Sequence, residues 1–393
     1  MPAPNAVKVA FTADGSDGEP ELIDGRRDEF FLSVGSVRMR TSMQRKGTAM
    51  PHTKVDDEFL RQADPFRREL LAHCYRMLGS AHDAEDLVQE TYLRAWRAYD
   101  RFEGRSSLRT WLHRIATTAC LTALESRSKR PMPTGLGGGS ADPGDDLADR
   151  PEVPWLEPIP DALAGTAQSD PATIVTERES IRLALVAALQ HLPPRQRAVL
   201  ILRDVLKWRA AEVAEAVGVT TTAVNSILQR ARAQLAQASP TPDDVEEPAA
   251  AEQRELLEKY VDAFERKDVT ALVELFTADI VWEMPPFASW YSGATDVGTH
   301  LAERCPARPG GVLMVPVEAN GQPAFAQYLR DPESGDFRAF TLQVLTLTRG
   351  GISHVANFMD TRLFELFGLP LTHPSAGVSA EEGQQPVAGA GQR

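Results

Sequence analysis

Two neighbouring amphipathic segments of opposite charge, residues 82–93 and 106–130, constrain this chain most. Apolar residues recur at three- and four-residue spacing from 59 to 126, which is typical of packed α-helices. The first segment contains four acids and no Lys or Arg, whereas the second is rich in Arg and Lys and poor in acids. One helical domain therefore presents two different surfaces, one suited to a basic protein and one suited to a nucleic acid.

The first segment predicts an outward acidic patch. At 100° per residue, its small and apolar residues share one face of the helix. The opposite face carries the acidic patch, which comprises Asp83, Asp86, Gln89, Glu90 and Leu93. The acids alone equally fit a solvated face whose charges favour the helix N-terminus. Leu93 among them favours a protein interface.

The second segment predicts a helix with a basic outward face. Ser106 or Ser107 supplies its N-cap. Trp111 falls in the apolar stripe, so we expect it in the core rather than stacked on a base. Guanidinium groups at this spacing can straddle phosphates, and Thr or His can contact base edges. The outward residues are Arg109, Thr110, His113, Arg114 and Thr117.

A short loop precedes this helix and contains Phe102, Gly104 and Arg105. An aromatic side chain beside bases can hold an unstacked nucleotide, because single strands are bound by stacking and charge together. The loop equally fits an ordinary turn between two helices.

Residues 209–227 fit a helix-turn-helix. Gly218 supplies the left-handed turn and small Ala214 permits close crossing of the helices. A plain helical hairpin is the alternative. The second helix turns a polar set outward at its N-terminal half, where such motifs contact the major groove. The set comprises Thr220, Thr222, Asn225, Ser226, Gln229 and Arg230.

Length and composition exclude several classes of protein. With 393 residues, 42% of them hydrophobic and 25% charged, the chain predicts several soluble globular domains. A net charge of −13 argues against indiscriminate coating of nucleic acid. The three cysteines are scattered, which favours a reducing cytoplasm and indicates neither a disulfide scaffold nor a metal site. No membrane-spanning run, signal peptide or cofactor motif is found.

Composition predicts the domain boundaries. A first helical domain spans 59–130, a helix-turn-helix domain spans 174–238, and a third domain spans 251–370. Residues 1–58 and 371–393 are expected to be a disordered extension and tail. The Pro/Gly/Asp-rich stretch 131–173 is expected to be a linker that contains one apolar island, 155–160.

The third domain alternates between helical and strand periodicity. Helices are expected at 252–267, 269–276, 295–303 and 363–367. Strands are expected at 280–284, 311–318, 323–329, 337–348 and 351–358. The chain is therefore predicted to be multidomain, with two all-α domains followed by an α+β domain.

The helical motifs resemble the extracytoplasmic-function branch of the sigma-70 family of RNA polymerase sigma factors. Residues 83–90 resemble the region 2 signature that docks on polymerase, residues 107–116 the −10 segment, and residues 192–232 region 4. The resemblance implies a non-enzymatic initiation factor whose partners are core polymerase and promoter DNA. It implies that the acidic patch docks polymerase, 102–117 contacts the −10 element, and 220–232 contacts the −35 element.

The third domain resembles the SnoaL-like, ketosteroid-isomerase-like cone, as in the SigG-type groups of that family. This implies regulation in cis and a pocket for a small ligand, lined by Trp282, Met284, Trp290, Tyr291, Phe340 and Phe358. Glu283, His354 and Asp360 are the acid/base candidates, although satisfied structural roles are expected. Residues 320–323 resemble a loop that contacts the sigma core in related factors. A helix-turn-helix regulator fused to a SnoaL-like enzyme or ligand sensor is the alternative.

Overall fold

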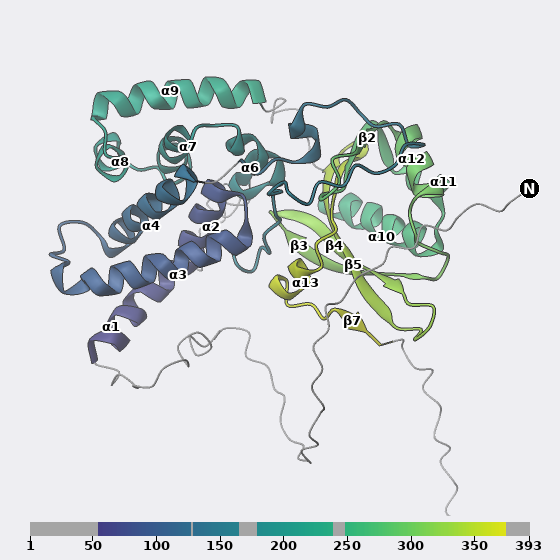
Figure 1. The fold of residues 1–393 in the computed structure, drawn as a ribbon, viewed down its shortest axis with the longest axis horizontal. Coiled ribbons are helices and arrows are strands. Elements are labelled where there is room, and N and C mark those ends of the chain that lie inside the picture. The colour runs from purple at the N-terminus through teal and green to yellow at the C-terminus, as the bar shows by residue number, and fades with distance from the viewer. Residues whose placement is uncertain (1–53, 127–128, 165–178, 239–247, 375–393) are drawn as a thin grey trace, which may run out of the picture. The chain divides into compact units, whose positions relative to one another are not determined.

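The computed structural model describes residues 54–126, 129–164, 179–238 and 248–374 (Figure 1). The first helical domain comprises α1 (Lys54–Ala63), η1 (Asp64–Phe66), α2 (Arg67–Leu78), α3 (Ala81–Ala98), η2 (Tyr99–Arg101) and α4 (Leu108–Glu125). Helix α1 begins inside the segment 1–58 that was expected to be disordered, and residues 1–53 lie outside the described residues. The helical periodicity predicted for 59–126 is confirmed.

Local capping sets the ends of these helices. Gly79 adopts a left-handed conformation, with φ 70°, and ends α2. The Ser80 hydroxyl then accepts the backbone N–H of Asp83 at 3.1 Å and starts α3. Ser107 caps α4 in the same way, through the N–H of Thr110 at 3.1 Å. The sequence predicted this second cap.

The helix-turn-helix domain comprises α6 (Leu183–Gln190), α7 (Pro194–Leu200), the π-helical turn η4 (Ile201–Val205), α8 (Ala210–Val217) and α9 (Thr221–Ala238). Gly218 has φ 71° between α8 and α9. The Thr220 hydroxyl accepts the N–H of Ala223 at 3.2 Å. The predicted turn and cap are therefore confirmed.

The described part of the linker, 131–164, packs against the third domain. It contains a short helix, η3 (Pro133–Leu136). Beyond this helix, it lies against the third domain. The N–H of Ala141 donates to the carbonyl of Trp290 at 2.8 Å. Further along, isolated β-bridges join Asp149 to Phe287 and Pro160 to Ala319. We call residues 131–164 the strap.

The third domain is a mixed sheet with helices, as predicted. Its elements are α10 (Ala250–Arg266), α11 (Val269–Glu274), β1 (Phe276–Glu283), β2 (Trp290–Ser292), α12 (Ala294–Glu303), β3 (Val312–Ala319), β4 (Gln322–Arg330), β5 (Phe337–Thr348), β6 (Gly351–Phe358), α13 (Arg362–Leu366) and β7 (Thr372–His373). The strand order is β2-β1-β6-β5-β4-β3, with β7 paired to β5. Strands β1 and β6 are parallel, and the other pairs are antiparallel. The sequence missed β2 and β7, and β7 lies inside the tail expected to be disordered.

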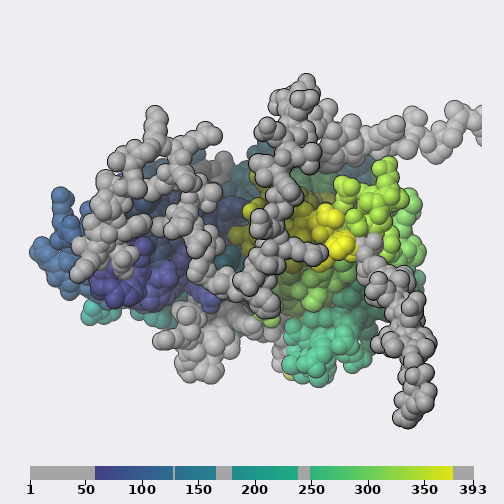
Figure 2. Space-filling model, turned by 90° about the horizontal axis from the view of Figure 1, so that it is seen from below, coloured from purple at the N-terminus to yellow at the C-terminus, as the bar shows by residue number. Residues whose placement is uncertain are grey.

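The two faces of the sheet belong to different hydrophobic cores. Phe325 lies in the core that packs against α10, together with Trp282. Its neighbours Ala324 and Ala326 point to the opposite face and join a core that continues into both helical domains. The last described residues, coloured yellow, lie beside green residues of the third domain in the space-filling view (Figure 2), and β7 pairs there with β5. The third domain therefore shares one core with the helices that precede it.

Candidate functional site

The acidic patch lies on the outward face of α3. Asp86 and Gln89 are exposed, whereas Asp83, Glu90 and Leu93 are half-buried. The opposite face is buried, as the helical phase predicted. Trp96, one turn beyond Leu93, has 45% of its surface exposed and was not singled out from the sequence, although a large exposed aromatic next to Leu93 extends an interface of this kind.

Two members of the acidic patch are already engaged inside the chain. The Glu90 carboxylate pairs with the Arg94 guanidinium at 2.7 Å. The Asp83 carboxylate pairs with the Arg130 guanidinium at 2.6 Å. Arg130 also donates to the carbonyl of Trp155 in the strap at 2.9 Å. Asp83 is therefore linked to the strap, while Asp86 and Gln89 face solvent.

Helix α4 carries the residues predicted to contact the −10 element, and two of them are placed differently than expected. Arg109, Thr110 and Arg114 are half-buried. His113 and Thr117 were predicted to face outward, but both are fully buried. The prediction was wrong because α4 is covered on more than one side. His73 of α2, in the same domain, contacts both residues, and Trp208 of the helix-turn-helix domain covers His113. The His113 ring lies 6.0 Å from the Trp208 ring of the helix-turn-helix domain.

Burial keeps the imidazoles of this region neutral at pH 7. It lowers the pKa of His113 to about 4, and the nearby positive charge of Arg109 acts in the same direction, while Glu69 opposes it. Burial also places the pKa of His73 well below its usual value. The His73 Nε2 and the Thr117 hydroxyl lie 3.0 Å apart. Both imidazoles thus lie in the packed interior of this domain.

The loop before α4 uses its aromatic side chain internally. The Phe102 ring stacks on Tyr99 at 6.3 Å and contacts Trp111 at 4.9 Å. Trp111 is half-buried and packs on the core, as expected. Arg105 remains exposed and pairs with Glu103 at 2.5 Å. The loop keeps a basic side chain at the surface beside a small aromatic cluster.

The polar set predicted to contact the −35 element is exposed to solvent. Thr220, Thr222, Asn225, Ser226, Gln229 and Arg230 are all exposed. Val224, Leu228 and Ala231, on the other side of α9, are buried. An exposed polar face after a helix-turn-helix turn is the arrangement that major-groove binding requires.

Helices α7 and α8 contact the first helical domain directly. The Arg114 and Glu215 side chains form an ion pair at 2.5 Å. Arg197 of α7 is buried and donates to the Met77 carbonyl at the end of α2. It also donates to the side-chain oxygen of Gln190 at 2.6 Å, and burial lowers its pKa to about 10. A buried cation at a helix C-terminus is favoured by the helix dipole.

Asn320 joins three parts of the chain. Its side-chain amide donates to the Tyr75 hydroxyl at 2.8 Å and to the Ile181 carbonyl at 2.7 Å. Its side-chain oxygen accepts the N–H of Ile159 in the strap at 3.0 Å. Gln322 accepts the N–H of Leu183 at 3.1 Å. The predicted contact between the loop at 320–323 and the helical domains is confirmed.

Glu157 of the strap caps the start of α3. Its carboxylate accepts the Ser80 hydroxyl at 2.7 Å and lies 3.0 Å from the His82 Nδ1. Burial opposes ionisation of Glu157, but these hydrogen bonds and Arg130 prevail and lower its pKa. The carboxylate raises the pKa of His82 in turn. The apolar island of the strap is therefore fastened by charge as well as by burial.

Two of the three acid/base candidates meet. Glu283 and His354 lie 2.8 Å apart, and the Glu283 side chain is 1% exposed. The second Glu283 oxygen accepts the N–H of Thr134 in the strap at 2.8 Å. Asp360 instead accepts hydrogen bonds from Arg362. Both oxygens of Glu283 are thus occupied by groups of the chain.

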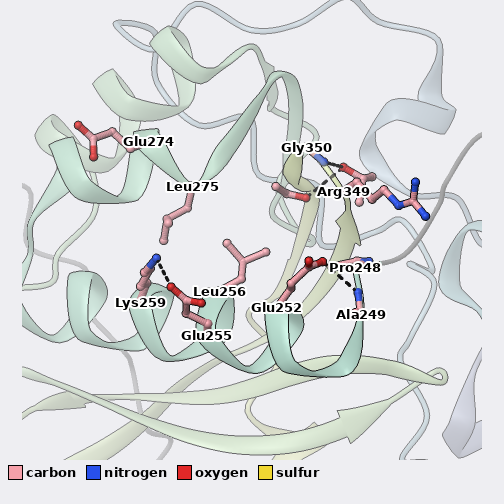
Figure 3. A pocket seen from close by; sticks show the side chains of 12 residues that line it. Pro248, Ala249, Glu252, Glu255, Leu256, Lys259, Glu274, Leu275, Arg349 and Gly350 are labelled. Atoms are coloured by element: carbon pink, nitrogen blue, oxygen red, sulfur yellow. Dashed lines mark hydrogen bonds and ion pairs between the residues drawn. The ribbon is translucent and has the colours of Figure 1, made fainter.

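The residues expected to line a ligand cavity are packed. Trp282, Met284, Tyr291 and Phe358 are buried, while Trp290 and Phe340 are half-buried, and Phe358 belongs to a different core from Trp282. An open hollow of about 780 Å³ lies instead beside α10 and is lined by charged side chains such as Glu252, Glu255 and Lys259 (Figure 3).

The part of the chain that the structure describes contains no cluster of His, Cys, Asp and Glu that could hold a metal ion. Among the described helices, none is long and apolar enough to cross a membrane. Cys74 and Cys120 are both buried, and a hydrogen bond between the two thiols raises the pKa of Cys74. Their separation in the sequence had hidden this proximity.

Comparison with known proteins agrees with this geometry. Residues 63–130 match Sigma-70 region 2, residues 182–235 match Sigma-70 region 4, and residues 257–355 match a SnoaL-like domain. The ECF RNA polymerase sigma factor SigG of Mycobacterium tuberculosis is 58% identical over 316 residues, which are 80% of this chain and 84% of the relative. SigJ of the same species is 30% identical over 56% of this chain and 62% of the relative.

A solved structure shows the same fold. The crystal structure of Mycobacterium tuberculosis extracytoplasmic function sigma factor SigJ aligns with a TM-score of 0.50 and 22% identity. The alignment covers 79% of this chain and 99% of that one. The residues that match Sigma-70 regions 2 and 4 contain α3 with the acidic patch, α4, and the helix-turn-helix. The chain therefore belongs to the extracytoplasmic-function branch of the sigma-70 family of RNA polymerase sigma factors.

Proposed function

We propose that the chain brings core RNA polymerase to promoters through three surfaces. The acidic patch of α3 docks polymerase, α4 and the loop before it contact the −10 element, and α9 contacts the −35 element. The observation that carries the proposal is the exposed polar set on α9, 220–230, placed directly after the turn at Gly218. Its side chains offer the donors and acceptors that distinguish base pairs in the major groove.

The acidic patch supports the docking role. Asp86 and Gln89 are exposed on α3, and half-buried Leu93 adds apolar surface beside them. Charged groups around an apolar centre give a protein interface both orientation and affinity. Asp83 is paired with Arg130 near the strap, so docking through Asp83 competes with an internal contact.

We further propose that the third domain restrains the two helical domains in cis. The −10 and −35 elements lie about 25 base pairs apart, which is roughly 85 Å at about 3.4 Å per base pair. Helix α4 contacts α8 here, and α9 is about 27 Å long at 1.5 Å per residue. The domains must therefore separate before both elements can be bound, and the contacts of Asn320 oppose that separation.

The third domain acts in this proposal as a regulator rather than an enzyme. The Glu283 carboxylate is engaged by His354 and by the strap, which suits a structural role better than proton transfer to a substrate. A small ligand that loosens the strap would couple this domain to promoter binding. The cavity for such a ligand would have to open among aromatics that are packed here.

Transcription of genomic DNA with core polymerase of the same organism tests the proposal. The wild-type chain should direct initiation at a limited set of start sites that share −35 and −10 sequences. Asn320→Ala should increase initiation at the same sites, because it removes hydrogen bonds to both helical domains. Thr372→Ala, an exposed residue away from the junction, serves as a control. Initiation no different from that of core polymerase alone would refute the proposal.

A further inference from the structure

The helix-turn-helix domain contacts the outward face of α4 in this structure through Trp208 and Glu215. The Trp208 ring faces the His113 ring at 6.0 Å and an interplanar angle of 62°. Next to it, the Glu215 carboxylate pairs with the Arg114 guanidinium at 2.5 Å. We propose that the helix-turn-helix domain is a built-in blocker of the −10-binding face, in which Trp208 and Glu215 occupy positions that DNA would take. This inference rests on the proposed function, because it requires α4 to bind DNA.

Trp208 is held in place by its backbone. Lys207 adopts a left-handed conformation with φ 57° and turns the chain between η4 and α8. The Trp208 N–H then donates to the Leu202 carbonyl at 2.9 Å, and its own carbonyl accepts from Arg203. Only 5% of Trp208 is exposed. The ring is a fixed part of the helix-turn-helix domain, so it leaves His113 only when the whole domain moves.

Glu215 takes the place of a phosphate. A guanidinium binds carboxylates and phosphates through the same planar array of donors. Arg114 was predicted to contact the DNA backbone, and here its donors face a carboxylate. The side chain of Glu215 is 63% exposed and that of Arg114 is 35% exposed, so the pair lies at the edge of the contact. A DNA strand arriving at this edge has to displace Glu215.

The blocking contact is separate from the restraint by the third domain. Asn320 and Gln322 contact α2, the strap and the start of α6. The blocker contacts α4 from α8 and from the segment before it. The third domain therefore helps to keep the helical domains together, whereas the helix-turn-helix domain itself excludes DNA from α4.

The test measures separation of the two domains without any promoter. Donor and acceptor dyes are attached to the full chain at Thr122→Cys on α4 and Gln237→Cys on α9, both exposed, in a Cys305→Ser background. Glu215→Arg replaces an attraction to Arg114 with a repulsion. Because exposed ion pairs contribute little, the separated fraction should rise about five-fold rather than a hundred-fold. Glu258→Arg, an exposed site on α10 with the same change in charge, should leave the fraction unchanged.

DNA binding then has to follow the separated fraction. The probe is a fluorescent single-stranded oligonucleotide of mixed sequence. The apparent affinity of a site that is open only part of the time scales with the open fraction. Glu215→Arg should therefore tighten binding by the same factor by which it raises the separated fraction, while Glu258→Arg should change binding less than two-fold. Arg114→Glu combined with Glu215→Arg should restore the wild-type separation of the dyes.

The outcomes distinguish the two proposals. An unchanged dye separation in Glu215→Arg, or no recovery in the double variant, would overturn the blocking contact. If Glu215→Arg separates the dyes without tightening oligonucleotide binding, DNA binding by α4 is refuted, and the blocking role of the helix-turn-helix domain is refuted with it. Trp208→Phe, which keeps an aromatic ring, should raise the separated fraction further. The Glu215 and Arg114 variants decide the question even if that substitution unfolds the domain.

Discussion

Acid should destabilise the folded chain through His113. This imidazole is fully buried and its pKa is lowered to about 4, against 6.5 for an ordinary histidine. Between these two values the unfolded chain binds a proton that the folded chain does not. The stability that depends on neutral His113 is therefore complete above pH 6.5 and is lost as the pH falls towards 4.

The magnitude follows from the pKa difference. A gap of about 2.5 units corresponds to about 3.4 kcal/mol once both states are protonated. By linkage, about 2 kcal/mol of this loss has appeared at about pH 5, and almost none at about pH 7.5. The charged groups around the imidazole are Glu69, which opposes the shift, and Arg76 and Arg109, which increase it. The ring that faces it from the helix-turn-helix domain, Trp208, is uncharged.

Urea unfolding followed by circular dichroism at the two pH values measures this effect. His113→Gln removes the titrating group, so the wild type should lose about 2 kcal/mol more than the variant on going from about pH 7.5 to about pH 5. His82→Gln is a control of opposite sign. Glu157 raises the pKa of His82, so His82 adds stability below its unfolded pKa that disappears as the pH rises through the folded pKa. Equal losses in wild type and His113→Gln would refute the reasoning.

Three further predictions follow from the surfaces and turns. Asp86→Arg should weaken co-purification with core polymerase at least ten-fold, while Glu258→Arg should leave it intact; undiminished co-purification of the first would contradict docking by α3. Arg230→Ala should cost about 1–3 kcal/mol of −35 DNA affinity and relax specificity at one base pair, and uniform weakening across sequences would oppose base contact. Gly79→Ala should lower the unfolding free energy measured by urea titration by about 2–3 kcal/mol, because backbone strain at φ 70° adds to a clash of the new Cβ with Leu156 at 2.9 Å. Gly104→Ala has the strain at φ 66° but open space around the new Cβ, so it should lower the unfolding free energy by about half as much.

The sequence predicted the features that depend on periodicity within a single element or on local backbone chemistry. Asp86 and Gln89 on α3 are exposed, as their phase required, and so is the polar set on α9. Gly218 and Thr220 form the predicted turn and cap because local backbone chemistry decides both. The strands β5 and β6 have the predicted bounds, since long alternating runs leave little freedom.

Features that depend on packing between elements distant in the sequence were not predictable in this way. His113 and Thr117 are buried because other elements cover α4, and no periodicity within α4 reports on that. The thiols of Cys74 and Cys120 meet although 45 residues separate them in the sequence. Strands β2 and β7 have three and two residues, too few for a recognisable alternation. The loop at 320–323 was found only through its resemblance to related factors.

The strap also determines which pieces of this protein can be exchanged with those of a relative. Ser140, Ala141 and Ala148 bond to the edge of the third domain around β2, and Thr134 bonds to Glu283. Those contacts are made by a segment that lies more than a hundred residues before the domain it fits. A chimera that takes only the residues from α10 onward from a relative would place the relative's sheet edge against the strap of this protein. A chimera that keeps these contacts has to take residues 131–164 and 248–374 from the same protein, although the chain places the helix-turn-helix between them.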